Sequence, residues 1–444
     1  MYQDEHFLSP CWEASSYEAS VASSEEPSAP LSSLPANVAT FSHSSNKEPT
    51  QLLCFCKSPR KEALETKDMH ISYLTNMPMF QNTKSAVRRR FTDFVFLYET
   101  LSSEFPMCCV PPLPDKHRLK YIKGDRFNTE FTTKRAKSLE IFLQRLAMHP
   151  QLRQSHHLCQ FLESQDWHAY VRSVVLHHKI NNIHVGNVLE GLSDVFLNAF
   201  TKLDKPNQLF IDMKEKIDKL DNNLTHIEKL VSKMVRNEVD LESNYNRMAL
   251  LFKQLSILEP SLSQELIMFS EAIENTEANI RTLRKHTDYV YLTSLHDLIS
   301  YASMQKQLLK QRDQKQMDIE GLSSYLLKIN LEKQQVIQSS GLLYFREKIE
   351  SLTGIDHEKA KQDRLKKLDE KNEEIKKEIE ISKQASQAFD EETIQENKIF
   401  NKIKEKEIKE NFSTFVKENI RFYKQILENW EKIVPQLELS QQKK

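Results

Sequence analysis

The sequence predicts a small α+β domain with a three-stranded sheet, followed by an elongated all-α bundle of three long helices. Strand-like segments precede helical ones between residues 51 and 170, which is the order expected of an α+β domain. From residue 261 to 434 the chain contains no proline and only Gly321, Gly341 and Gly354. Apolar residues recur from residue 217 onward at alternating steps of three and four, as in coiled coils.

Residues 1–50 are predicted to be a disordered tail. They are rich in Ser, Ala, Pro and Glu, have no apolar period and carry a net charge of −6. A segment of this composition buries too little apolar surface to offset the entropy cost of ordering it. A tail regulated by phosphorylation is the functional alternative, and the sequence leaves it open.

Residues 51–168 are predicted to form the α+β domain. Three short, half-apolar segments are strand candidates: 52–56, 70–74 and 86–91. Two later segments place apolar residues at helical intervals: 93–105 and 133–149. Between these helices Pro111, Pro112 and Pro114 exclude a helix.

Residues 190–440, after a linker at 169–189, are predicted to form three antiparallel helices separated near Pro260 and near residues 339–341. Because a narrow bundle buries little apolar surface per residue, we expect an elongated dimer. The positions expected to be buried in that dimer are Ile217, Leu224, Val231 and Tyr245. An inert spacer is the alternative for this region.

Four basic residues of the helical region are expected near a tip that meets a membrane: Lys306, Lys310, Arg312 and Lys315. A cluster of basic side chains is attracted to the anionic surface of a bilayer. The alternative is an ordinary solvated charged face.

Several classes of protein are disfavoured. The sequence contains no run of about 18 apolar residues, so no membrane span is expected. The first residues do not resemble a signal peptide. The cysteines form no CxxC pair, which argues against a zinc site or a disulfide framework. The first glycine is Gly124, so no Gly-rich phosphate loop precedes it, and no GxSxG or HExxH motif occurs. We therefore expect no enzyme, no cofactor and no metal.

The basic region 51–170, with a net charge of +6, is expected to bind anions. Within it, Arg88, Arg89 and Arg90 directly precede an aromatic run that begins at Phe91. The Gly-aromatic pattern of RNA-binding sheets is missing, so nucleic acid is not the expected partner. A phosphoinositide fits better, because arginine grips a phosphate with two donors and an aromatic ring packs on an inositol ring.

Three motifs lie in a fixed order between residues 88 and 143: RRRFTDF, PPLPDK and KRAKSLEIFL. Together they resemble the phox-homology (PX) domain, with its Arg-Arg-Tyr-x-Asp-Phe strand, proline-rich loop and Arg-xxx-Leu-xx-Phe-Leu helix. A PX domain followed by three long helices resembles the sorting nexins with a membrane-curving BAR domain. The stretches PPLPDKHRLKYIKGDRFNTEFTTKR and FYKQILENWEKI are most similar to the fungal sorting nexin-4 group.

The resemblance implies a lipid headgroup site of five residues. Arg90 would grip the 3-phosphate, and Phe91 would stack on the inositol ring where the family usually has tyrosine. Thr92 would lie near the headgroup, Lys116 would meet the 1-phosphate, and Arg135 would reach the ring hydroxyls. The register of the first two strands stays open.

The neighbouring residues of the motif are expected to play other roles. Phe94, Leu97 and Tyr98 would anchor the strand and helix that carry Arg90. Arg88 and Arg89 are expected to be surface charges that add general attraction to a bilayer.

The resemblance also implies a biological role. The protein would be peripheral on early endosomes and the preautophagosomal structure, binding phosphatidylinositol 3-phosphate and curved membrane. It would act in endosome-to-Golgi retrieval of cargo and in selective autophagy, including cytoplasm-to-vacuole transport and pexophagy. Its partners would be other PX-BAR sorting nexins, in a homodimer or heterodimer, together with autophagy machinery. A coiled-coil scaffold or tether with incidental lipid binding is the alternative.

Overall fold

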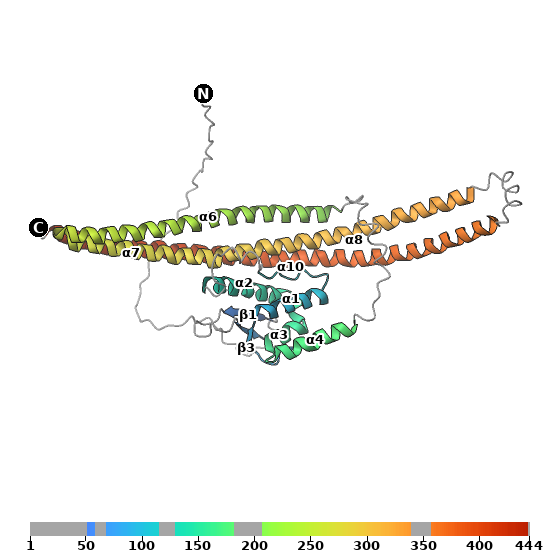
Figure 1. Ribbon diagram of the computed structural model, residues 1–444, viewed down its shortest axis with the longest axis horizontal. Helices are drawn as coiled ribbons and strands as arrows, with labels where there is room; N and C mark the ends of the chain where they lie inside the picture. The colour runs from blue at the N-terminus through green and yellow to red at the C-terminus, as the bar shows by residue number, and fades with distance from the viewer. Residues whose placement is uncertain (1–50, 58–67, 115–128, 182–206, 339–356, 443–444) are drawn as a thin grey trace, which may run out of the picture. The chain divides into compact units, whose positions relative to one another are not determined.

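The structure is a computed structural model that describes residues 51–57, 68–114, 129–181, 207–338 and 357–442 (Figure 1). The expected tail at 1–50 lies outside these ranges. Within the ranges, no helix has both the length and the apolar character needed to cross a bilayer.

The first domain contains an antiparallel sheet in the order β1-β2-β3. Its strands are β1 (Leu52–Lys57), β2 (Met69–Thr75) and β3 (Lys84–Arg89). Leu53 pairs with Leu74, and Ile71 pairs with Val87, which settles the register left open by the sequence. Alternate residues of β1 and β2 are buried, as expected of a sheet with one face against a core.

Four α-helices complete this domain: α1 (Phe91–Glu104), α2 (Thr129–Met148), α3 (His156–Glu163) and α4 (Trp167–Asn181), with a 3₁₀ turn η3 (Leu152–Gln154) before α3. Helix α2 packs against β1. Phe94 and Leu97 of α1 are fully buried beside Phe142 and Leu143 of α2, and Tyr98 packs at the edge of the same core. Helix α4 occupies the first part of the segment expected to be a linker.

The expected third strand is two residues too long at its C-terminal end. The sequence placed Phe91 in this strand, but β3 ends at Arg89 and Phe91 is the first residue of α1. The reason is a helix cap, because the carboxylate of Asp93 accepts a hydrogen bond from the backbone N–H of Arg90 at 2.7 Å. A carboxylate at the third helical position favours helix initiation at this point.

The second region consists of long helices, as expected (Figure 1). They are α6 (Gln208–Leu258), α7 (Ser263–His286), α8 (Thr293–Gln338) and α10 (His357–Gln442), with a 3₁₀ turn η4 (Pro260–Leu262) and a π-helical turn η5 (Thr287–Leu292). Because η5 joins α7 to α8 without a break, the chain makes three antiparallel passes. The 86 residues of α10 extend about 130 Å at 1.5 Å per residue.

The positions expected to be buried in a dimer divide into two kinds. Ile217 and Leu224 are already buried within one chain, whereas Val231 and Tyr245 are half-buried. A different set of large apolar side chains is exposed along α6 from Leu230 onward and along the second half of α10. Its most exposed members are Leu230, Leu251, Ile257, Leu258, Leu427 and Tyr423.

The expectation of a basic tip is wrong for Lys306 and Arg312 of α8, whereas Lys310 and Lys315 are exposed, and for these two it stays a prediction. Lys306 bonds to the carboxylates of Asp218 and Asp221 at 2.8 and 2.7 Å. Arg312 is buried and forms a two-pronged ion pair with Asp390 at 2.7 and 2.9 Å. These cations lie in the first half of α8 and bind helices on either side, because the interior of a three-helix bundle requires paired charges.

Candidate functional site

The candidate headgroup site is centred on Arg90, which precedes the first turn of α1. The backbone of Arg90 is extended, with φ −86° and ψ 162°, and the cap from Asp93 holds it there. Its side chain is 60% exposed, and Nε donates to Asp68 at 3.0 Å. Arg90 therefore lies at the positive end of the α1 dipole, which is a favourable location for an anion.

A second arginine reaches the same place from another helix. The guanidinium carbon of Arg135, on α2, lies 4.7 Å from the centre of the Phe91 ring and 4.3 Å from that of Phe131. Stacking between two aromatic faces orients the guanidinium and reduces the freedom it would lose on binding a ligand. The structure thus places Arg135 of α2 on the ring of Phe91, the residue that directly follows Arg90.

The other two expected site residues are less well defined by the structure. Thr92 is exposed in the first turn of α1, next to Phe91. Lys116 lies outside the described residues. Sequence reasoning missed Asp68, the ion-pair partner of Arg90, and Phe131, which flanks Arg135. Phe131 had a visible signal, since it precedes Arg135 by four residues and so lies on the same helix face.

Arg89 is not the surface charge that the sequence suggested. It is 3% exposed, and its Nε and Nη2 donate to the carbonyl oxygens of Phe161 and Ser164 at 2.9 and 2.6 Å. Its guanidinium also lies over the rings of Phe161 and Trp167. Because Phe161 is in the last turn of α3 and Ser164 follows that helix, Arg89 caps its negative end.

Alternation along β3 explains the difference between the three arginines. Arg88 points to the solvent face of the sheet and is exposed, as expected, and Arg89 points to the core face. Burial lowers the pKa of Arg89 to about 10, which leaves the guanidinium charged at pH 7. Of the triplet, only Arg90 is both exposed and fixed at a helix N-terminus.

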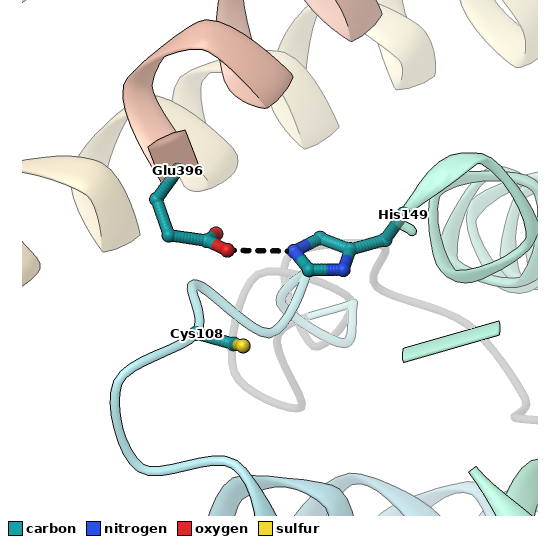
Figure 2. A group of neighbouring side chains, drawn as sticks. All are labelled: Cys108, His149 and Glu396. Atoms are coloured by element: carbon teal, nitrogen blue, oxygen red, sulfur yellow. Dashed lines mark hydrogen bonds and ion pairs between the residues drawn. The ribbon is translucent and has the colours of Figure 1, made fainter. Parts of the chain in front are cut away.

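A second cluster could be taken for a metal site. The ligand atoms of Cys108, His149 and Glu396 lie within 4.8 Å of one another (Figure 2). However, His149 Nδ1 accepts a hydrogen bond from the backbone N–H of Leu152 at 3.2 Å, so the ring proton is on Nε2. Nε2 lies 2.8 Å from Glu396 and donates to its carboxylate.

Metal binding would oppose this arrangement of protons. Nε2 could ligate a metal only if the proton moved to Nδ1, where it would face the N–H of Leu152. Burial, together with the nearby Glu396, raises the pKa of the Cys108 thiol far above its ordinary value, and the thiol rather than the thiolate is present. The three residues therefore fit a hydrogen-bonded structural cluster better than a metal centre.

Comparisons with known proteins agree with this fold. The PX domain family matches residues 77–165. The fold is similar to that in the cryo-EM structure of the SNX-BAR Mvp1 tetramer, with a TM-score of 0.51 at 19% sequence identity. The alignment covers 86% of this chain and 99% of the chain in that structure. That structural likeness supports the fold of a PX domain with a long helical region.

Curated relatives match over most of their length. Sorting nexin-4 of Emericella nidulans is 42% identical over 408 residues, which cover 88% of this chain and 84% of the relative. Sorting nexin-4 of Neurospora crassa is 41% identical, with 87% and 84% covered. Sorting nexin-4 of Cryptococcus neoformans is 35% identical, with 86% and 80% covered. With this identity over the PX domain and the long helices together, the chain belongs to the sorting nexin-4 family.

Proposed function

We propose that the protein binds phosphatidylinositol 3-phosphate on membranes through Arg90, Phe91 and Arg135. The observation that carries the proposal is the Arg135 guanidinium stacked on the ring of Phe91, the first residue of α1, directly after the exposed Arg90. One arginine supplies paired donors to a phosphate, while the second reaches the ring hydroxyls. Thr92 and Lys116 complete the proposed site, with Lys116 meeting the 1-phosphate.

The ion pair between Arg90 and Asp68 has a role in this proposal. Arg90 is well exposed, so the pair contributes little to stability. A phosphate carries more charge than one carboxylate and offers more acceptor atoms to the guanidinium. In the absence of lipid, Asp68 holds the Arg90 side chain extended toward solvent. When the lipid headgroup binds, its phosphate replaces Asp68 as the partner of Arg90.

Dimerisation of the helical region is the second part of the proposal. The apolar side chains exposed on α6 and α10 would form a contiguous patch that one chain leaves uncovered. A second chain with the same architecture, either a copy of this one or another PX-BAR sorting nexin, covers that patch. Such a dimer presents two headgroup sites to one bilayer, and avidity then strengthens binding.

The biological proposal follows from these two parts and from the family. We place the protein peripherally on early endosomes and the preautophagosomal structure. There it would act in endosome-to-Golgi retrieval and in selective autophagy, including cytoplasm-to-vacuole transport and pexophagy, alongside autophagy machinery. We propose no catalytic step. We propose that the PX domain spans residues 51–168 and the BAR-type helical region residues 190–440.

Vesicle flotation tests the lipid site. The parent chain should float with vesicles containing phosphatidylinositol 3-phosphate and much less with vesicles containing only phosphatidylserine. Arg90→Ala and Arg135→Ala should each lose the selective part, whereas Arg88→Ala should lose only the salt-sensitive attraction. Equal flotation of the parent on both vesicle types would favour a coiled-coil scaffold with incidental lipid binding.

A further inference from the structure

Helix α2 contacts three different parts of the molecule. One face packs in the core of the PX domain through Leu139, Phe142 and Leu143. Arg135, one turn before Leu139 on the same side of the helix, forms part of the candidate headgroup site. A second face contacts α8 and the π-helical turn η5 of the helical region, where Lys134 pairs with Asp288 at 2.7 Å. A residue on this second face is therefore connected to the headgroup site through one rigid helix.

Arg145 is the principal residue of this second face. It is 1% exposed, and its Nε and Nη2 donate to the two carboxylate oxygens of Glu407 on α10 at 2.7 and 2.8 Å. Nη1 donates to the backbone carbonyl of Asp297 on α8 at 3.1 Å, and the guanidinium lies 4.6 Å from the centre of the Tyr301 ring. Burial alone would lower the pKa of Arg145, but the Glu407 carboxylate raises it, so the guanidinium stays charged.

A second buried pair lies beside the first. His149, one turn after Arg145, donates to Glu396, and both side chains are 0% exposed (Figure 2). The other carboxylate oxygen of Glu396 accepts the backbone N–H of Cys109 at 2.9 Å. Glu396 and Glu407 are eleven residues apart, which is about three turns of helix and places them on one face of α10. The PX domain is thus held at two separate points along α10.

The chemistry of these contacts favours orientation over stability. A buried ion pair adds little net stability compared with an apolar pair of similar size, because removing two charges from water is costly. Its geometry is nevertheless strict, since a two-pronged Arg–carboxylate pair requires coplanar groups at fixed distance. Apolar contacts around Tyr301 and Phe400, which include Cys109 and Met148, would hold the PX domain against the helical region, but they would not fix its orientation.

We infer that Arg145 and Glu407, with His149 and Glu396, are positioning residues for membrane binding: they fix the headgroup site relative to the helical region so that one anionic bilayer engages both. This inference rests on the proposed function. The two carboxylates do not touch the lipid, and the headgroup site forms within the PX domain without them. Their effect is on the binding of a membrane surface.

The experiment uses Glu407→Gln and Glu396→Gln in the full chain, singly and together. Calorimetry with a soluble short-chain phosphatidylinositol 3-phosphate should give an affinity within about twofold of the parent, since the headgroup site remains folded. Affinity for vesicles containing the long-chain lipid should fall about tenfold or more for the double variant. The matched control is Glu405→Gln, an exposed carboxylate on α10 that should leave both affinities unchanged.

A milder variant covers the case in which a buried glutamine prevents folding. Asp288→Asn weakens the contact with Lys134 at the rim of the same face and should lower vesicle affinity several-fold at unchanged soluble-headgroup affinity. Retained vesicle affinity in every variant that still binds the soluble headgroup would overturn the inference.

A lipid-free measurement separates this inference from the proposed function. Thermal unfolding of the parent should be one transition, and the double variant should show two, because the PX domain and helices then unfold independently. If the parent binds no phosphatidylinositol 3-phosphate, the proposed function is wrong. Independently of that result, a single unfolding transition in the double variant, unchanged from the parent, would contradict the positioning role.

Discussion

Replacing Arg89 by alanine should destabilise the PX domain strongly, although the residue belongs to a basic triplet. Two carbonyl oxygens at the end of α3 would lose their donors, those of Phe161 and Ser164. Leaving a buried acceptor unpaired costs about 1–3 kcal/mol, and two such groups give about 2–6 kcal/mol. Relief from burying a cation offsets part of this, so we expect a net loss of about 2–4 kcal/mol.

Urea unfolding followed by tryptophan fluorescence measures this loss, because Trp167 packs directly on the Arg89 guanidinium. The matched control is Arg88→Ala, an exposed change on the opposite face of β3 that should stay within about 0.5 kcal/mol of the parent. An Arg89→Ala midpoint equal to that of Arg88→Ala would refute the helix-capping role. Arg89→Ala should also lose lipid binding, but in proportion to its unfolded fraction.

Three further results are expected. Burial raises the pKa of Asp297 to about 6 despite the nearby Arg145, so the ionised carboxylate destabilises the folded state. The contribution of this residue to the stability of the parent is therefore most favourable below about pH 4, where Asp297 is protonated, and this contribution is lost as the pH rises through 6. Asp297→Asn should therefore raise the melting temperature relative to the parent at pH 7.5, with a difference that shrinks toward pH 4.5; a difference constant with pH contradicts this. Tyr423→Asp should give a monomer by light scattering at unchanged helix content, because Tyr423 is 67% exposed in one chain, and persistence of the dimer would remove α10 from the interface. Arg312→Ala should lower the free energy of unfolding in denaturant by about 3 kcal/mol, because it leaves Asp390 unpaired. The control Lys310→Ala, at an exposed position, should lower it by less than about 0.5 kcal/mol. Equal losses in the two variants would indicate that Arg312 is a surface charge like Lys310.

Periodic patterns predicted the elements well because burial of one face dictates them locally. The first strand was expected at 52–56 and spans Leu52–Lys57, and the heptad series became three long antiparallel passes. The junction between β3 and α1 was missed by two residues. Asp93, three residues after Arg90, is the local signal that would have placed it, since a carboxylate at that position starts helices.

The roles of individual charges were harder to foresee, because their partners are distant in sequence. Arg89 bonds to residues more than 70 positions away, and Arg312 to a carboxylate 78 positions away. A charged side chain is exposed by default, and only the fold reveals a carbonyl or carboxylate that makes its burial favourable. The same holds for His149 and Glu396, separated by 247 positions, which no spacing rule connects.

The central claim is that Arg90 recognises a phosphate through its paired donors. Calorimetric titration of Arg90→Lys with soluble short-chain phosphatidylinositol 3-phosphate tests it most directly, because lysine keeps the positive charge but loses the fork. Arg90 is exposed and its ion pair contributes little, so the melting temperature should match the parent. We predict a loss of binding of at least tenfold in Arg90→Lys at unchanged melting temperature; parent-like affinity in this variant would contradict the assignment of the site.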